Sequence, residues 1–406
     1  MPTSQAPFSS RRHSNHIGKA TAMMIPAATD VFVIGGGPAG LAAAIAARLR
    51  GFNVTVADGS HPPIDKACGE GLMPDGRTAL RKLDVQLTPQ DGFALRGVRF
   101  IDDRTEAEAR FSLAAVPGEE FAVGIGVRRP VLHRRMIERA ASLGVTLFWN
   151  TPVVALRDGE VFLAESHAPA RSVIRARWIV GADGSGSRVR RWSGLDAHRQ
   201  KDGRFAFRRH YCVKPWSDCA EVYWGERAQA YVTPVSAEEI CVVAVTRSPG
   251  HRMDGALREF PALLRKLANA KAASADRGAV TSMHRLARVT CGNLALIGDA
   301  SGSVDAITGE GLSLSFHQAA ALAHALEREN LALYERSHRR LAGRPAFMAR
   351  MMLALDASPF LRRRVLCAFS HDPKIFARLL AAHIGETSPA QLALTGVTLG
   401  WRFLVA

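Results

Sequence analysis

The stretch DKACGEGL, from Asp65 to Leu72, places a thiol among glycines, where a bound molecule can come close to the chain. Cys68 could act there as a nucleophile, as a metal ligand or as half of a disulfide. The six cysteines lie far apart and form no CxxC pair, so neither a zinc site nor a disulfide framework is indicated. Two interpretations stay open: chemistry by the thiol, or a small packing residue, which is what most free cysteines are.

A second group of residues is suited to binding a dinucleotide. The stretch DVFVIGGGPAGLAAAIAARLRGFNVTVADGS, which starts at Asp30, reads as a buried strand, a glycine turn, an alanine-rich helix and a second strand. Gly35 allows the turn, Gly37 lets a pyrophosphate approach the backbone, and Gly40 lets helix and strand pack closely. Asp58 follows about 20 residues later and can accept the hydroxyls of an adenosine ribose. The stretch therefore predicts a dinucleotide site.

Two later stretches indicate which dinucleotide it is. WIVGADGSGSRVRRW contains an Asp-Gly pair that begins at Asp183, and NLALIGDASGSVDAITGEGLSLS contains a Gly-Asp pair that ends at Asp299. A carboxylate at the end of an apolar strand, as at Asp299, can accept a hydrogen bond from a polyol such as the ribityl chain of FAD. Gly309 and Gly311 would let a planar ring lie against the backbone. The helix that begins there would direct its positive end at the ring and stabilise a reduced flavin.

These three motifs, in this order, resemble those of the FAD-dependent oxidoreductases with the para-hydroxybenzoate hydroxylase fold, which include aromatic and quinone-ring hydroxylases and geranylgeranyl reductases. The resemblance runs from Asp30 to about Tyr334. It implies FAD as the cofactor and NAD(P)H as the electron donor, which the Asp-Gly motif handles transiently in hydroxylases. VRRPVLHRRMIERA resembles the family's Arg-x-x-Leu helix start. The residues that the resemblance places at FAD are Gly35, Gly37, Ala39, Gly40, Asp58, Arg129, Asp183, Gly184, Arg190, Gly298, Asp299, Gly309, Gly311 and Leu312.

The branch of the family decides the expected reaction. GDASG, TGEG and the cysteine-glycine loop resemble the reductases, and this resemblance implies that Cys68 donates a proton to a substrate carbanion. The aromatic segment typical of lipid reductases is represented only by AYVTPV, around Tyr231. The sequence therefore favours a monooxygenase that hydroxylates an aromatic or quinol-like hydrophobic metabolite with NAD(P)H and oxygen. Reduction of isoprenoid double bonds is the alternative, and a flavin-binding redox partner without turnover is a third hypothesis.

The elements that position these residues predict an α/β fold with a Rossmann-like FAD-binding domain, an inserted antiparallel β-sheet domain for the substrate, and C-terminal helices. We expect a disordered extension over 1–29, the FAD-binding domain over 30–95, 125–200 and 281–335, the substrate domain over 96–124 and 201–280, and a helical region over 336–406. Strands are predicted at 204–213, 220–225, 229–234 and 239–246. Candidates for the pocket wall, with sheet-surface packing as the alternative, are Arg208, Arg209, His210, Trp224 and Tyr231. Lys66 and Glu70 are candidate cofactor or substrate contacts, with solvated loop charges favoured.

The C-terminal region is basic, and prolines at 345, 359 and 373 are expected to cut it into short helices. These helices form either a capping bundle or a membrane-surface patch, with Arg362, Arg363 and Arg364, through which a lipid-like substrate enters.

Composition excludes several classes of protein. The chain of 406 residues is 47% hydrophobic, yet no stretch approaches the roughly 20 apolar residues of a membrane span. The net charge is +16, but the arginines are spread along the chain without a recognition motif, so we expect no nucleic-acid partner. The first 29 residues lack the apolar run of a secretory signal. We therefore expect a cytoplasmic protein with a small hydrophobic or aromatic substrate, no metal, and peripheral membrane contact as an option.

Overall fold

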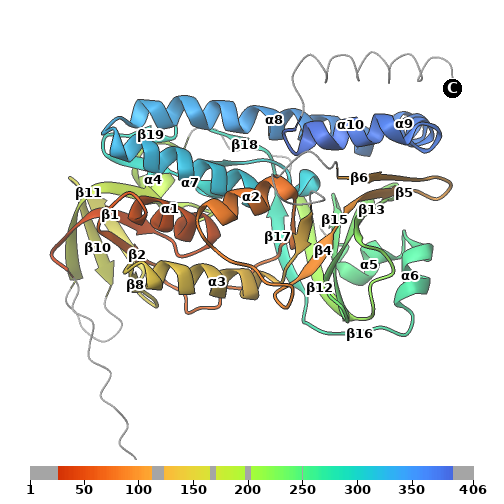
Figure 1. The fold of residues 1–406 in the computed structure, drawn as a ribbon, viewed down its shortest axis with the longest axis horizontal. Coiled ribbons are helices and arrows are strands. Elements are labelled where there is room, and N and C mark those ends of the chain that lie inside the picture. The colour runs from red at the N-terminus through yellow and green to blue at the C-terminus, as the bar shows by residue number, and fades with distance from the viewer. Residues whose placement is uncertain (1–25, 112–122, 165–170, 197–202, 249, 387–406) are drawn as a thin grey trace, which may run out of the picture.

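The computed structural model describes residues 26–111, 123–164, 171–196, 203–248 and 250–386. In this part of the chain two eight-stranded sheets lie side by side, with helices covering them (Figure 1). This is the predicted α/β fold, with a Rossmann-like unit, a largely antiparallel second sheet and C-terminal helices. Most of the extension predicted over 1–29 lies outside the described residues, and the first strand already begins at Ala28.

The first sheet carries the glycine turn. Its order is β19 (Thr290–Cys291), β20 (Leu294–Leu296), β11 (Arg171–Gly181), β1 (Ala28–Ile34), β2 (Val54–Ala57) and β8 (Thr146–Phe148), and β10 (Glu160–Ala164) and β9 (Val153–Arg157) extend it antiparallel from β11. β1 is parallel to both of its neighbours, β2 and β11. Because parallel strands end at one edge of a sheet, the segments that follow β1, β2, β11 and β20 meet there. That edge brings together the motifs singled out in the sequence.

Helices pack on this sheet and against one another. α1 (Pro38–Arg48) starts directly after the glycine turn and contacts α3 (Arg129–Ser142) and α7 (Gly311–Glu327). α2 (Pro74–Lys82) also lies against α7, and α4 (Arg188–Trp192) follows β11. A Cβ on Gly76 of α2 would lie 2.1 Å from Ser313 Oγ of α7. Glycine therefore allows this close helix contact.

The second sheet has the order β16 (Lys271–Ala272), β12 (Arg204–Cys212), β15 (Glu239–Thr246), β14 (Ala228–Ser236), β13 (Cys219–Trp224), β5 (Gly97–Ile101) and β6 (Glu106–Arg110), and β17 (Arg277–Thr281) pairs with β12. Its strands β12 to β15 closely match the four predicted runs and are antiparallel. The pair of β13 and β5 is parallel. α5 (Met253–Leu257) and α6 (Pro261–Leu267) accompany this sheet. Smaller elements are β3 (Gly71–Leu72), β4 (Phe93–Leu95), β7 (Gly124–Gly126), β18 (His284–Arg285), β21 (Gly302–Ser303), and the 3-10 turns η1 (Gly298–Ser301) and η2 (Ala306–Thr308).

Three helices complete the described chain: α8 (Leu331–Ala357), α9 (Pro359–His371) and α10 (Pro373–His383). Pro359 and Pro373 begin helices, as expected, because a proline at the first position gives up no intrahelical hydrogen bond. The prediction that Pro345 divides the region is wrong, since it lies inside the 27-residue α8. Its interior position costs about 3 kcal/mol, which the packing of α8 along α7 offsets. None of the helices within the described ranges is long and apolar enough to span a membrane.

The C-terminal helices cover one side of the second sheet (Figure 1). Phe376 of α10 stacks on Phe369 of α9, with ring centroids 4.7 Å apart, and its ring lies 4.7 Å from that of Phe100 in β5. These aromatic rings belong to a hydrophobic core that is separate from the core of the first sheet. The C-terminal helices are thus an integral wall of the molecule.

Candidate active site

The turn between β1 and α1 has the geometry that a pyrophosphate site requires. Gly35 has φ +109°, a conformation that favours glycine. A Cβ on Gly40 would lie 1.9 Å from the Gly35 carbonyl oxygen, so Gly40 serves close packing. Among the described atoms, none lies within 4 Å of the place that a Cβ on Gly37 would take. The backbone is therefore open at Gly37, where α1 directs its free N–H groups.

Asp58, which directly follows β2, connects this strand to the glycine turn through a hydrogen bond. Its carboxylate accepts a hydrogen bond from the Gly36 N–H at 2.8 Å and another from the Ser60 N–H at 2.7 Å. Each oxygen keeps a second lone pair for a ligand hydroxyl. Asp58 also lines the cavity described below, as a ribose-binding carboxylate must.

The Asp-Gly motif after β11 combines structural and lining residues. The Asp183 carboxylate accepts hydrogen bonds from the Arg188 and Val189 N–H groups and so caps α4. Asp183 and Gly184 line the cavity. Arg190 is not among the lining residues, because its guanidinium donates to the Ser185 and Ala300 carbonyls and ties this motif to the Gly-Asp motif.

After the glycine turn with Asp58 and the Asp-Gly motif, a third set of residues forms the end of the site that is suited to the flavin ring. Asp299 opens onto the cavity, and enclosure by protein raises the pKa of its carboxyl. In the described part of the chain no atom comes within 4 Å of a Cβ position on Gly309 or Gly311, so a flat ring can lie against them. Arg129, at the start of α3, has a buried Nε without a hydrogen-bond partner among the described residues. Such an orphaned donor calls for an acceptor from a ligand.

One continuous cavity of about 920 Å³ connects these sets and reaches the C-terminal helices. The cavity offers three kinds of feature that FAD requires: backbone that is open at three glycines, an arginine donor without a partner, and two carboxylates at strand ends. Together they fit the phosphates, the polyol and the ring of FAD. The sequence-predicted residues that line the cavity are Gly35, Gly37, Ala39, Asp58, Lys66, Cys68, Glu70, Arg129, Asp183, Gly184, Tyr231, Gly298, Asp299, Gly309, Gly311 and Leu312.

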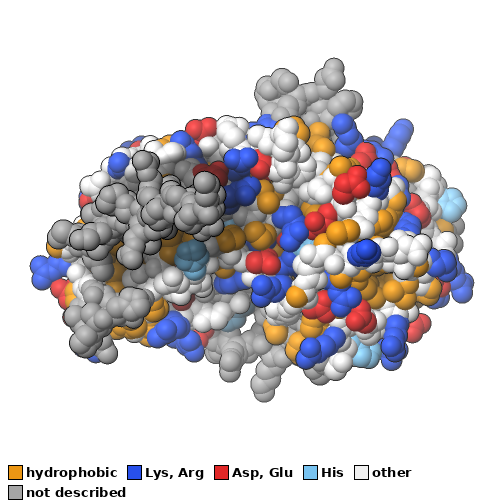
Figure 2. All heavy atoms as spheres, turned by 90° about the horizontal axis from the view of Figure 1, so that it is seen from below, with side chains coloured by type: hydrophobic (Ala, Val, Ile, Leu, Met, Phe, Trp, Pro, Cys, Tyr) orange, Lys and Arg blue, Asp and Glu red, His pale blue; other side chains and the backbone are white. Residues whose placement is uncertain are grey.

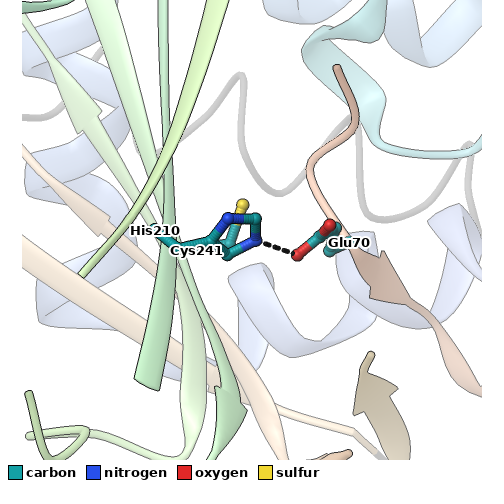
Figure 3. A group of neighbouring side chains, drawn as sticks. All are labelled: Glu70, His210 and Cys241. Atoms are coloured by element: carbon teal, nitrogen blue, oxygen red, sulfur yellow. Dashed lines mark hydrogen bonds and ion pairs between the residues drawn. The ribbon is translucent and has the colours of Figure 1, made fainter. Parts of the chain in front are cut away.

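The cysteine loop borders the same cavity and rests on a buried polar network. Glu70, favoured in the sequence as a solvated charge, is only 2% exposed and has φ +58°, which is unusual for a residue with a side chain. Its carboxylate accepts hydrogen bonds from the Arg129 N–H at 2.9 Å and from His210 Nε2 at 2.6 Å (Figure 3). Arg208 donates to His210 Nδ1 at 2.8 Å and to Asp65 at 2.7 Å. This network holds Glu70 in place, and with it the loop that carries Cys68.

Glu70, His210 and Cys241 lie close enough together to resemble a metal site, with ligand atoms within 4.8 Å of one another (Figure 3). The Arg208 guanidinium lies 2.8 Å from His210 Nδ1 and 3.9 Å from Glu70 Oε1, so a positive charge already stands beside two of the three candidate ligands. Burial also raises the pKa of the Cys241 thiol well above its ordinary value, which disfavours the thiolate that a metal needs. The cluster therefore fits a structural hydrogen-bond network better than a metal.

The inserted sheet forms one wall of the cavity. Of the five side chains proposed for this wall, Tyr231 is among the lining residues of the described chain. Arg208 and His210 belong to the buried network, Trp224 is buried in the second core, and Arg209 pairs with surface carboxylates. The wall consists mainly of small and β-branched side chains: Ala206, Ala220, Val222, Thr233, Val243 and Val245.

Beyond the ring end, the cavity continues as an apolar arm between the second sheet and the C-terminal helices. Sequence reasoning missed this arm, since nothing in the local pattern shows which helical stripe faces the cofactor. We define it by its lining residues: Met348, Met351, Met352, Leu355, Leu361, Val365, Phe369, Phe376, Leu379 and Leu380. Flexible methionine and leucine side chains suit a long, apolar ligand.

Comparison with known proteins agrees with this geometry. Residues 28–330 match the model of the FAD binding domain family. The chain belongs to this family. It is an FAD-dependent oxidoreductase, and the glycine turn, Asp58 and Asp299 are the places where this flavoprotein's geometry fits its cofactor.

Individual relatives of this flavoprotein differ in the reactions that their names describe. The menaquinone reductase of Mycobacterium tuberculosis (strain H37Rv) is 27% identical over 328 residues, which cover 76% of this chain and 79% of that protein. Digeranylgeranylglycerophospholipid reductase 2 of Methanosphaera stadtmanae is 30% identical over 177 residues, and the match covers 42% of this chain and only 43% of that protein. The crystal structure of p-nitrophenol 4-monooxygenase from Pseudomonas putida has a TM-score of 0.74 at 18% identity, covering 89% of this chain and all of that one.

Proposed function

We propose that this protein is an FAD-dependent reductase that saturates a carbon–carbon double bond in an isoprenoid-bearing lipid or quinone. The observation that carries the proposal is the apolar arm, which adjoins the ring end of the cofactor site and is enclosed by α8, α9 and α10. A compact phenol would leave this arm unfilled, whereas an isoprenoid chain matches its apolar lining. The relatives named as reductases of menaquinone and of a digeranylgeranyl lipid support the same substrate class.

The chain's own residues orient the substrate and handle its proton. When bound and reduced, FAD supplies a hydride. The apolar arm excludes water and holds the isoprenoid chain, and Cys68 at the cavity wall is a candidate proton donor. The Glu70 N–H donates to Cys68 Sγ at 3.4 Å, which stabilises the sulfur after its proton has left. We further propose NAD(P)H as the electron donor, in keeping with the Asp-Gly motif.

The test compares chain lengths under anaerobic conditions. The reduced holoprotein is mixed with menaquinones that carry short or long isoprenoid chains and with a digeranylgeranyl lipid, and the products are analysed by mass spectrometry. We expect saturated product without oxygen. Met352→Trp, which fills the apolar arm, should abolish the reaction of the long chains while leaving FAD bound. Leu353→Trp is the matched control, because Leu353 is the next residue on α8 and is not among the lining residues of the described chain.

Hydroxylation of an aromatic or quinol-like substrate is the second candidate, supported by the fold shared with p-nitrophenol 4-monooxygenase. Mixing the reduced protein with oxygen and candidate phenols distinguishes the two reactions. A transient flavin hydroperoxide and hydroxylated product, with no anaerobic saturation, would replace the reductase proposal with a monooxygenase.

A further inference from the structure

A buried acid lies beside the ring end of the site and takes no part in the cofactor site as described. Glu310 stands between Gly309 and Gly311 and is 3% exposed. Within the described ranges, neither of its carboxyl oxygens has a hydrogen-bond partner. Burial raises the pKa of this carboxyl to about 8. Burial without hydrogen-bond donors favours the protonated form of a carboxyl.

Four charged or titratable side chains form a cluster with Glu310: Arg344 and His383 lie next to it, and Asp75 and His317 follow beyond Arg344. Arg344 of α8 lies 3.6 Å from Glu310 Oε1, and the same nitrogen, Nη2, lies 3.5 Å from Asp75 of α2. His383 of α10 places its Nδ1 3.6 Å from Glu310 Oε2. His317 of α7 lies 3.7 Å from Asp75 and is 36% exposed, so it reaches the surface. The cluster thus extends from solvent to the interior.

The other end of the cluster opens into the cavity. His383 lines it, next to Leu379 and Leu380 of the apolar arm. Its Nε2 donates to the Thr308 carbonyl at 3.2 Å, and Thr308 also lines the cavity. Burial lowers the pKa of His383 to about 4. His383 is therefore neutral at pH 7, with its proton directed at the cavity wall.

Charge balance fixes one proton on the pair of Glu310 and His383. Asp75 and Arg344 cancel each other, so the buried cluster is neutral only when the pair carries one proton in addition to the proton on His383 Nε2. That proton can sit on Glu310 or, with Glu310 ionised, make His383 doubly protonated. Both arrangements avoid an uncompensated buried charge, which costs several kcal/mol.

We propose that His317, Asp75, Glu310 and His383 form a proton relay from solvent to the ring end of the cavity. Asp75 passes a proton to Glu310, directly or through water, while Arg344 holds the two carboxyls together. Glu310 protonates His383 Nδ1, and His383 releases its Nε2 proton into the cavity, either to the substrate carbanion or to the Cys68 thiolate that remains once Cys68 has protonated the substrate. The O–H bond of Glu310 and the N–H bond at Nε2 break as bonds to Nδ1 and to the acceptor form, and no electrons are transferred.

The relay deepens the proposed function and rests on it, because saturating a double bond consumes one solvent proton for each hydride. The apolar arm offers no polar path of its own among its lining residues. His383 is a titratable side chain that borders the apolar arm. It is a catalytic residue in this proposal, whereas Arg344 is a positioning residue.

The kinetic test uses FAD-loaded Glu310→Gln and His383→Asn, with Glu327→Gln as the matched control at the exposed end of the same helix. The reduced proteins are mixed anaerobically with a digeranylgeranyl lipid, and flavin oxidation is followed across pH. We expect the two relay variants to react at least about a hundredfold more slowly, the lower end of what a general acid contributes, and formic acid or imidazole to restore part of the rate. FAD affinity and reduction by dithionite should stay within about twofold of the wild type. Wild-type rates and an unchanged pH profile in both variants would overturn the relay.

An infrared measurement separates failure of the relay from failure of the proposed function. The band of a protonated carboxylic acid should titrate near pH 8 in the wild type, be absent in Glu310→Gln and shift in His383→Asn. This readout needs no substrate, so it tests the relay even if the wild type reduces neither the lipid nor menaquinone. A band that is missing, or that does not respond to His383→Asn, contradicts the shared proton and therefore the relay.

Discussion

At the scale of single residues, the site depends on polar groups that are buried and paired. Arg208 is fully buried and faces both Asp65 and Glu70, so it neutralises the carboxylates of the cysteine loop. Breaking a buried ion pair by removing one partner costs about 3–5 kcal/mol, because the other charge stays buried. The neighbouring Arg209 points to the opposite side of β12 and pairs with Asp254, which is 75% exposed.

Arg208→Met should therefore lower the free energy of unfolding by about 3–5 kcal/mol, measured by urea denaturation. Arg209→Met, the same substitution one residue along, should cost less, about 1 kcal/mol, since its partners Asp254 and Asp276 remain in contact with solvent when the arginine is removed. Equal shifts of the urea midpoint in the two variants would contradict the role given to the buried network.

The raised pKa of Glu310 leads to a second prediction, which concerns how the stability of the folded protein depends on pH. Its folded-state pKa of about 8 lies above the ordinary value of 4.5, so the folded protein holds this proton more tightly than the unfolded chain. The stabilisation is complete below pH 4.5 and is lost as the pH rises through 8. His383, with its pKa lowered from 6.5 to about 4, acts in the opposite direction between those two values. The window from pH 6.5 to 8 therefore reports on Glu310.

Over that window the Tm of the wild type should fall, and the Tm of Glu310→Gln should change much less. Differential scanning calorimetry at several pH values measures this, with Glu327→Gln expected to follow the wild type. Parallel Tm curves for Glu310→Gln and the wild type would show that this carboxyl does not titrate in the folded protein.

At the scale of elements, the cofactor half of the site could be read from the sequence and the substrate half could not. Strand, glycine turn and helix follow one another within a short stretch, so local pattern predicted the positions of Gly37 and Asp58. Helix α8 was misjudged because the cost of Pro345 is local, whereas the packing that offsets it comes from α7. Glu310 and His383 lie far apart in the chain and meet only when α10 folds back onto η2. No spacing rule reveals such a contact.

The contacts that hold α10 against the rest of the molecule can be tested in the same way. Phe376 lies between Phe369 and Phe100, so Phe376→Ala should remove about 3–5 kcal/mol from the C-terminal helices. Hydrogen exchange should accelerate in α9 and α10 and remain unchanged in β1 and α1, which belong to the other core. Phe347→Ala is the control, because this phenylalanine of α8 is 47% exposed. Uniform acceleration throughout the protein would show that the helices do not form a separate cooperative unit.

At the scale of the whole molecule, the question is how the side chains behind the net charge of +16 are distributed over the surface. On the face shown in Figure 2, basic side chains lie scattered among acidic and hydrophobic ones. The helices that enclose the apolar arm also carry exposed phenylalanines, Phe347 and Phe360, together with exposed Arg350 and Arg363. Arg362 does not belong to this surface, contrary to the patch suggested by the sequence, because it is 4% exposed and packs over the Trp224 ring.

We propose that this combination of exposed phenylalanine and arginine, on the helices next to the apolar arm, contacts an anionic membrane from which an isoprenoid substrate enters. Burying a phenylalanine side chain contributes about 1.5–3 kcal/mol, so Phe347→Ser with Phe360→Ser should weaken binding to phosphatidylglycerol vesicles by about tenfold or more. Arg350→Glu with Arg363→Glu should also weaken vesicle binding. This effect should be larger at low salt than at high salt, because high salt screens the attraction between arginine and anionic lipid even in the wild type. Leu264→Ser, on α6 and 38% exposed, is the control and should leave binding unchanged. If vesicle co-sedimentation is the same for all of these variants, the substrate does not enter from a membrane bound at this surface, and the enclosed arm must be filled from solution.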